Sequence, residues 1–354
     1  MLQRRIAIIG AGPGGLTLAR LLQLQNIPYT LYERDASVSA RTEGGSLDLQ
    51  TESGQRALGA AGLMEQFNKV ARYQGQDFKL LDKHRKIHIE HISTETERDR
   101  PEIDRQVLRK LLLDSINSDF VRWDHRLRLV SGPREDGRFQ LQFDGRDDVA
   151  VADMVIGADG AWSVVRKQVS DAVPTYSTCT MIEVRFRDVD NRHPEISRLV
   201  GNGSLGAYSH DRALMAQRNG DGSIRVYICL RVPHSWAGDC GIDFNSPPAT
   251  RDGLIKHFME WDDGLKDLIK QCDDEGISVR PLYTLPAGYH WALKPNITLI
   301  GDAAHLMTPF AGQGVNLAML DALLLCEAIV KNKDNLEAAI GGFADLVRQY
   351  MPNV

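Results

Sequence analysis

The glycine-rich segment at residues 10–15 constrains the fold of this chain more than any other feature. It reads GAGPGG and follows a near-continuous β-branched run at 4–9 (RRIAII), which predicts a strand buried on both faces. An apolar helical pattern comes next and stops at Asn26, and a second strand-like run at 29–32 ends at Glu33. This order of strand, glycine turn, helix, strand and acid is typical of a dinucleotide-binding unit.

The three glycines at G-x-G-x-x-G spacing each have a physical task. Gly10 allows the tight turn, Gly12 lets the backbone approach a pyrophosphate, and Gly15 lets the helix pack close to the first strand. The free N–H groups and the positive dipole end of the helix favour a phosphate at this turn. Glu33 can accept hydrogen bonds from adenosine ribose hydroxyls and disfavours a ribose 2′-phosphate, so the unit favours FAD or NAD over NADP.

Two later strands also end in small residues and an acid. A buried strand at 153–156 precedes Asp159 and predicts a second nucleotide-binding turn followed by a helix, although an ordinary turn has the same pattern. A third buried strand at 297–300 precedes Asp302, which a plain helix cap would also explain.

The remaining patterns predict ordinary elements. Residues 104–113 predict a helix with Asp104 as its N-cap and with Val107, Leu108, Leu111 and Leu112 on one face. We also expect a helix at 53–61, strands at 78–81 and 87–92, an antiparallel meander at 121–151, a long helix that Gly312 and Gly314 open, and a last helix at 336–350.

The length of 354 residues allows two domains, or one domain with an insertion. Between 175 and 281 the composition changes to strands rich in Val, Ile, Tyr and Arg, followed by two amphipathic helices at 251–271. This change predicts a separate sheet layer inserted into the first domain.

Composition also excludes several classes of partner. The net charge is -5 and no lysine or arginine block occurs, so we expect no nucleic acid. The apolar run at the N-terminus is too short for a signal sequence or a membrane span, so we expect no membrane contact. The five cysteines are far apart with no C-x-x-C pair, which argues against a metal site or a disulfide framework and favours a cytoplasmic protein.

Three motifs together resemble a known family. They are the glycine segment with Glu33, the segment GADGAWSVVR at 157–166, and the segment GDAAHLMTPFAGQGVN at 301–316. The set is similar to the single-component FAD-dependent aromatic hydroxylases of the para-hydroxybenzoate hydroxylase type. Within that family, the likeness is greatest to the tetracycline-inactivating flavin monooxygenases, in the pieces YERD (32–35), GGSLDLQ (44–50), SGQRALGAAGL (53–63) and PEIDRQVLRKLLL (101–113).

The resemblance implies FAD as cofactor and assigns residues to it. Glu33 and Arg34 would hold the adenosine end, and Asp302 the ribityl or pyrophosphate portion. The helix after Gly312 would point its N–H groups at the N1/C2=O edge of the flavin. The full set of expected FAD contacts is Gly10, Gly12, Pro13, Gly14, Gly15, Glu33, Arg34, Asp48, Arg105, Asp159, Asp302, Gly314, Val315 and Asn316, with a flavin pocket of Pro309, Phe310, Gly312, Gln313 and Gly314.

The resemblance also places NADPH and substrate. NADPH would bind transiently at the surface and meet Arg41, which a solvated loop charge would explain equally well. The subgroup offers a glutamine and a histidine to its drug, where this chain has Glu183 and Arg225. Those two side chains could instead form a cross-strand ion pair. The expected substrate contacts are Glu183, Arg225, Met215 and Phe310, whereas His305 is expected to be a core histidine satisfied by backbone.

The family reaction implies a flavin-dependent monooxygenase. It would hydroxylate an aromatic or tetracycline-like small molecule with NADPH and O2 through a C4a-hydroperoxyflavin, with no side chain as catalytic acid or base. The role would lie in antibiotic resistance or in biosynthesis. Three alternatives stay open: an FAD-dependent reductase or dehydrogenase without oxygen insertion, a flavoprotein that sequesters a drug, and a nicotinamide dehydrogenase.

The expected fold is therefore α/β, with a Rossmann-like FAD-binding domain of GR2 type in three β-β-α layers. We expect that domain at 1–72, 100–174 and 282–330, an inserted mixed-sheet substrate domain at 73–99 and 175–281, and a bridging C-terminal helix at 331–354. Relatives usually continue with a longer bracing helix than these last residues supply. We expect the protein to be a monomer.

Overall fold

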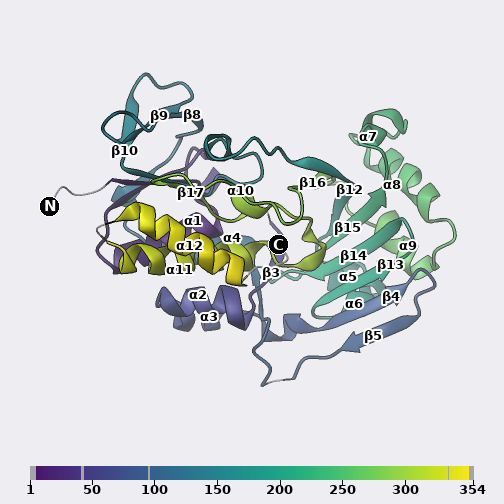
Figure 1. Ribbon diagram of the computed structural model, residues 1–354. Coiled ribbons are helices and arrows are strands. Elements are labelled where there is room, and N and C mark those ends of the chain that lie inside the picture. The colour runs from purple at the N-terminus through teal and green to yellow at the C-terminus, as the bar shows by residue number, and fades with distance from the viewer. Residues whose placement is uncertain (1–4, 41–43, 95, 334, 351–354) are drawn as a thin grey trace.

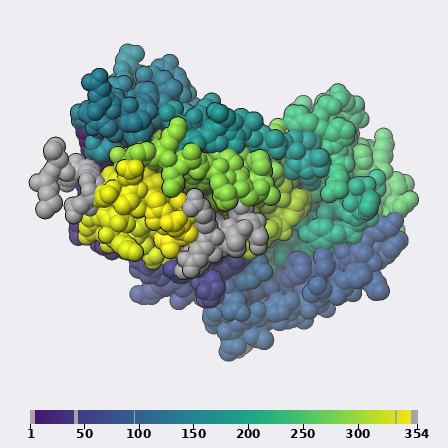
Figure 2. Space-filling view, viewed as in Figure 1, coloured from purple at the N-terminus to yellow at the C-terminus, as the bar shows by residue number. Residues whose placement is uncertain are grey.

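The structure, a computed structural model, describes residues 5–40, 44–94, 96–333 and 335–350. Two bodies lie side by side, one holding both ends of the described chain and the other built on a large twisted sheet (Figure 1). In the space-filling view the two bodies meet across the middle of the molecule (Figure 2).

A five-stranded parallel sheet forms the centre of the first body. Its apolar strands are buried because layers cover both faces, as in other parallel sheets. In spatial order the strands are β17 (Ile297–Leu299), β11 (Met154–Gly157), β1 (Ile6–Ile9), β2 (Tyr29–Tyr32) and β7 (Val121–Arg122).

Helices cover one face of this sheet and a second sheet covers the other. Ile6 and Ile8 of β1 pack among the helices, whereas Ala7 and Ile9 pack against the second sheet. The covering helices include α1 (Pro13–Leu24), α4 (Arg105–Asp114), α11 (Gly314–Lys331) and α12 (Leu336–Tyr350), and the second sheet consists of β8 (Leu127–Ser131), β9 (Phe139–Phe143) and β10 (Val149–Ala152). The predicted β-β-α layering is confirmed.

The second body is a seven-stranded sheet with helices on one face. In spatial order its strands are β16 (Ser278–Thr284), β12 (Thr175–Phe186), β15 (Ile224–Arg231), β14 (Arg212–Arg218), β13 (Ser204–Tyr208), β4 (Phe78–Asp82) and β5 (Ile87–His91). The helices on this side of the molecule are α5 (Val189–Arg192), α6 (Pro194–Val200), α7 (Trp236–Asp239), α8 (Pro247–Ile255) and α9 (Asp263–Lys270). The domain limits remain a prediction, and β16 runs across the expected limit at 281.

Short elements connect the two bodies. A two-stranded ribbon, β3 (Ser46–Asp48) with β6 (Glu102–Asp104), lies between the sheets. The remaining helices are α2 (Arg56–Ala60), α3 (Met64–Val70) and α10 (Asp302–His305). None of the described helices is long and apolar enough to cross a membrane.

Some local predictions differ from the structure. The segment after Asp159 forms a turn and only a short 3-10 helix at Val165–Gln168. The expected helix at 53–61 is present, but it begins with a π-helical turn at Thr51–Gln55. The expected meander starts one strand too early, because β7 belongs to the parallel sheet.

Asp104 precedes α4 but does not cap it. Its carboxylate instead accepts hydrogen bonds from Arg72 Nη1 at 2.7 Å and from the backbone N–H of Gly220 at 3.1 Å. Val107, which we expected on the same apolar face as Leu108 and Leu112, is 37% exposed, whereas those two leucines are buried. The Asp104 carboxylate therefore binds groups that are distant in sequence instead of capping the helix.

Candidate cofactor and substrate site

The glycine turn has the geometry that its sequence predicts. Gly10 has φ +107°, and its N–H donates to the Tyr32 carbonyl at 2.8 Å. A Cβ at Gly15 would overlap the Gly10 carbonyl oxygen, so the helix packs on the strand as expected. Gly12, by contrast, faces open space at the start of α1, and a phosphate could approach the backbone there.

Glu33 lies beside this turn at the end of β2. Its side chain is buried, and Oε2 accepts a hydrogen bond from the Ala11 N–H at 2.6 Å while Oε1 accepts one from the Asp35 N–H at 3.0 Å. The carboxylate is therefore held next to the glycine turn. The neighbouring Arg34 is exposed.

Asp159 lies at the end of β11 and has one unused oxygen. Oδ2 accepts from the Val164 N–H at 2.7 Å and the Val165 N–H at 3.3 Å. Oδ1 is buried and has no hydrogen-bond partner among the described residues, and burial raises the pKa of this carboxyl. The nearby Arg166 is also buried and donates to the Ala161 carbonyl.

Asp302 follows β17, so it lies at the same end of the parallel sheet as Asp159. A Cβ at Gly314, the first residue of α11, would be 3.9 Å from Asp302 Oδ1. The carboxylate is solvent-accessible, but the protein around it raises its pKa by desolvation, while the charges of His305, Arg105 and Arg166 act in the opposite direction. Residues from all three predicted segments thus lie near one another at the carboxyl ends of the parallel strands, in a region that we call the cofactor groove.

The start of α11 differs in detail from our expectation. Gly312 lies before the helix in a left-handed conformation with φ +63°, so Gly314 alone opens it. Pro309 begins the preceding 3-10 turn at Pro309–Ala311, and Phe310 within that turn is 42% exposed. Gln313 and Val315 flank the helix start.

The Asn316 side chain binds other parts of the protein. It is fully buried, its Oδ1 accepts from the Gln50 N–H at 2.8 Å and from Ser53 Oγ at 3.2 Å, and its Nδ2 donates to the Asp48 carbonyl at 2.9 Å. Because these bonds occupy the side chain, any contact of Asn316 with a cofactor would come from its backbone. The Asp48 carboxylate pairs with Arg100 at 2.9 Å.

Three of the four expected substrate residues, Glu183, Arg225 and Met215, share the open, helix-free face of the large sheet. Phe310 lies instead in the 3-10 turn before α11. Glu183 of β12 lies directly opposite Tyr227 of β15, which lies directly opposite Met215 of β14. Arg225 Nη1 donates to Glu183 Oε1, and Arg280 Nη2 lies 3.4 Å from the other oxygen. The cross-strand ion pair that was left open therefore forms, and both of its members are buried.

Sequence reasoning missed Tyr227, although it lies two residues after Arg225 on the same strand face. Burial, followed by the negative charge of Glu183, raises the pKa of Tyr227 to about 12, so its hydroxyl remains a hydrogen-bond donor at neutral pH. A Cβ at Gly45 would overlap this hydroxyl. Strand alternation could have identified Tyr227 once Arg225 was chosen.

The face continues into an apolar region. Met181, Ala213 and Cys229 form a small buried cluster against which Met215, Tyr227, Cys179 and Leu282 pack. One sheet face therefore presents apolar side chains at one end and charged side chains at the other.

Comparison with known proteins identifies the family. A model of the FAD binding domain family matches residues 3–231 and 292–333. The chain belongs to this FAD-binding family. Monooxygenase penA of Penicillium thymicola is 32% identical over 395 residues, which cover 97% of this chain and 90% of that protein.

Solved structures share the fold of this FAD-binding family member. Klebsiella pneumoniae HpxO complexed with FAD and uric acid aligns with a TM-score of 0.77 and 18% identity, covering 96% of this chain and 83% of that one. Tetracycline destructase Tet(51) aligns with a TM-score of 0.68 and 20% identity, covering 99% and 87%. The resemblance to flavin-dependent hydroxylases of the para-hydroxybenzoate hydroxylase type, and with it the class of FAD-dependent monooxygenases, is confirmed.

The structure fits an FAD in the groove. Gly12 provides open space at a helix start, and Asp159 provides a buried oxygen without a partner, as a bound polar ligand would require. His305, however, is not satisfied by backbone as predicted, because its Nε2 contacts Asp321 Oδ2 at 2.6 Å. Arg41, the expected NADPH contact, lies outside the described residues.

Proposed function

We propose that this member of the FAD-binding family uses NADPH and O2 to hydroxylate an aromatic or tetracycline-like small molecule on the open sheet face. FAD, when bound, would supply the oxygen chemistry, and the protein would bind, orient and shield the substrate. The observation that carries the proposal is the position of Arg105. Its charge acts both on Asp302 in the cofactor groove and on Tyr227 of the sheet face, so the two sites are neighbours.

The loop at Gly44 and Gly45 supports this arrangement. A Cβ at Gly44 would lie 2.9 Å from the Arg105 Cβ, and a Cβ at Gly45 would overlap the Tyr227 hydroxyl. The loop thus passes between the groove and the sheet face with no room for side chains. We assign Gly10, Gly12, Glu33, Asp159 and Asp302 to FAD as the chief contacts, as the sequence predicts.

The chemistry of the sheet face favours a flat substrate with one polar, electron-rich end. The apolar cluster around Met181 would receive the ring system, and the Tyr227 hydroxyl would donate to a carbonyl or phenolic oxygen. Arg225 adds a buried Nε–H without a partner among the described residues. Phenols, fused polyketide rings and oxidised purines all have this combination of a flat ring and acceptor oxygens.

We also propose that the protein is a cytoplasmic monomer. All five cysteines are free thiols, which suits a reducing compartment.

The test is turnover by the FAD-loaded protein. NADPH oxidation, O2 uptake and product mass would be measured across a panel of phenols, anthraquinones, tetracyclines and uric acid. Substrate-dependent O2 uptake with a mass gain of one oxygen is the expected result. Reduction of a compound without O2 uptake would replace the proposal by a reductase, and NADPH oxidation that yields only peroxide with every compound unchanged would reject these substrate classes.

Asp302→Ala tests the cofactor site separately. We expect this variant to lose bound FAD during purification, as judged by flavin absorbance per protein. Retention of one FAD per chain would contradict the assignment of Asp302.

A further inference from the structure

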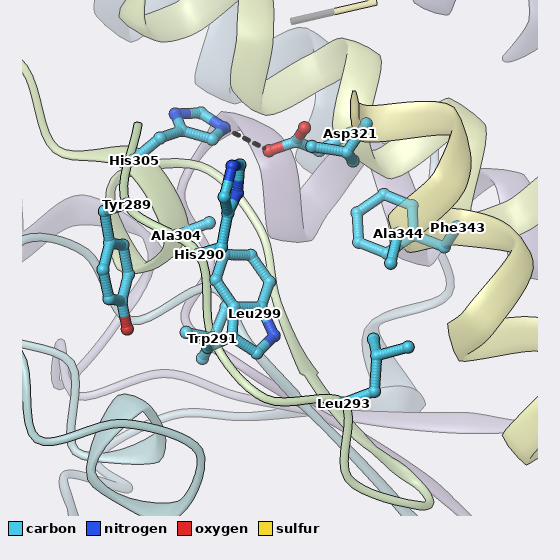
Figure 3. Close-up of a pocket in the computed structure, with 11 residues that line it drawn as sticks. Tyr289, His290, Trp291, Leu293, Leu299, Ala304, His305, Asp321, Phe343 and Ala344 are labelled. Atoms are coloured by element: carbon cyan, nitrogen blue, oxygen red, sulfur yellow. Dashed lines mark hydrogen bonds and ion pairs between the residues drawn. The ribbon is translucent and has the colours of Figure 1, made fainter. Parts of the chain in front are cut away.

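A single carboxylate oxygen holds both ends of the turn that carries Asp302. Asp321 Oδ2 accepts a hydrogen bond from the Gly301 N–H at 2.7 Å and contacts His305 Nε2 at 2.6 Å. Gly301 precedes α10 and His305 ends it, so the two contacts enclose this four-residue helix. Figure 3 shows His305 and Asp321 facing each other, joined by this contact.

The turn is packed closely against α11, so it has little freedom to move. Asp321 lies on α11 and is 1% exposed. Gly301 has φ +60°, and a Cβ there would lie 3.0 Å from the Ala318 Cβ of the same helix, so no side chain fits between turn and helix. The turn is closed internally by the bond from the His305 N–H to the Gly301 carbonyl at 2.9 Å.

The charges around His305 favour its protonated form. Burial opposes the charge, but Asp321 and then Asp302 outweigh it, so the pKa of His305 is raised above its ordinary value. Because Asp321 Oδ2 can only accept, His305 Nε2 must carry a proton in either form. Nδ1 is buried and has no partner among the described residues.

Apart from Asp321, the other residues that line this pocket with His305 are not among the groups that shift its pKa. Among the described residues that line this pocket, the loop at 286–296 contributes the titratable side chains Tyr289 and His290 (Figure 3). Helix α12 contributes the apolar side chains Phe343, Ala344 and Val347. The two carboxylates on α10 and α11 therefore dominate the environment of this imidazole.

We propose that His305 and Asp321 are a positioning pair for the FAD-binding carboxylate of Asp302. Asp321 fixes the turn at both ends, and the His305 imidazolium places a positive charge behind Asp302, which keeps Asp302 ionised and directed into the groove. The pair itself does not touch the cofactor. This inference rests on the proposed role of Asp302 in binding FAD.

The structure predicts different effects for three substitutions. His305→Ala removes both the donor and the charge, His305→Gln keeps an N–H donor without the charge, and Asp321→Asn weakens the acceptor that holds both ends of the turn. His290→Asn is the matched control, because His290 is an exposed histidine of the same pocket.

The experiment is titration of each apoprotein with FAD by flavin fluorescence between pH 6 and 9, with thermal unfolding of the apoprotein as a check of the fold. We expect His305→Ala and Asp321→Asn to weaken FAD binding about 10- to 100-fold, as loss of a charge-assisted hydrogen bond does. Binding to the natural protein should weaken as the pH rises through the pKa of His305. His305→Gln should show a smaller loss and no such pH dependence, and His290→Asn should match the natural protein.

Two outcomes separate this inference from the proposed function. If Asp302→Ala loses FAD while His305→Ala and Asp321→Asn bind it as the natural protein does, the positioning role is wrong and the cofactor site stands. If Asp302→Ala retains FAD, the cofactor assignment itself fails. Should His305→Ala not fold, His305→Gln decides, because an unchanged pH dependence in that variant would overturn the inference.

Discussion

Arg225 and Glu183 form a buried ion pair across β15 and β12, on the sheet face that we assign to the substrate. Removing one member of such a pair leaves the other charge buried without its main partner, which typically costs about 3–5 kcal/mol. We expect Glu183→Leu or Arg225→Met alone to lower the free energy of unfolding by that order. The double variant should recover most of the loss, because apolar pairs of similar volume often replace buried ion pairs at little cost.

Urea unfolding of the two single variants and the double variant checks this prediction. Arg280→Met is the matched control, since Arg280 also lies near Glu183 but its side chain is 58% exposed, so only a small change is expected. Equal destabilisation in the double and single variants would show that the cost does not come from leaving one charge of the pair without its partner. A stable double variant would then report directly whether the charges are needed for turnover.

Glu102 gives the fold a dependence on pH. Burial raises the pKa of its carboxyl to about 7, although hydrogen bonds from Ser46 and Gln217 partly oppose the shift. A carboxyl with a raised pKa binds its proton more tightly in the folded state, so stability falls as the pH rises from about 4.5 towards 7. The loss is roughly 3 kcal/mol by linkage, and Glu102→Gln should remove it.

The measurement is urea unfolding at pH 5 and pH 8. The natural protein should lose more stability between these values than Glu102→Gln does. Glu90→Gln, an exposed glutamate of β5, provides the control and should behave as the natural protein. A Glu102→Gln curve parallel to that of the natural protein would contradict the raised pKa.

Local sequence patterns predicted the parallel sheet well because residues adjacent in sequence specify each of its strands and turns. The run at 6–9 is apolar, and the run at 29–32 (YTLY) is rich in residues that favour strands. The glycines at 10 and 15 are required by close contacts within the same turn. Side-chain partners distant in sequence were not predictable in this way. Asp104 looks like a helix cap until Arg72 and Gly220 come within reach, and His305 looks like a core histidine until Asp321 lies beside it.

Asn316 joins α11 to the segment at 48–53. Its buried amide bonds to Gln50, Ser53 and Asp48. Asn316→Ala leaves these groups without partners, and each unsatisfied buried group costs about 1–3 kcal/mol. We therefore expect a clear fall in melting temperature, whereas Asn245→Ala at an exposed position should have almost no effect. An unchanged melting temperature in the Asn316 variant would show that water replaces the amide.

Gly45 and Tyr227 are predicted to act as a fitted pair. Gly45→Ala places a methyl group on the Tyr227 hydroxyl, so the loop or the ring must move, at a cost of about 1–3 kcal/mol. Because the loop lies between the cofactor groove and the sheet face, we expect turnover of the best panel substrate to fall together with stability. Tyr227→Phe removes the overlapping oxygen, so Gly45→Ala combined with Tyr227→Phe should regain stability.

A double-mutant cycle of thermal stability and of kcat/KM separates the two roles of the tyrosine. Recovery of stability without recovery of kcat/KM is the expected result, since the double variant relieves the overlap but lacks the hydroxyl that we assign to the substrate. Gly238→Ala is the control, because a Cβ there meets nothing within 4 Å. If Gly45→Ala behaves like that control, the loop is not pressed against the sheet. If the double variant also regains full kcat/KM, Tyr227 serves only to pack the loop and the polar end of the substrate must be held by another group, with Arg225 the first to test.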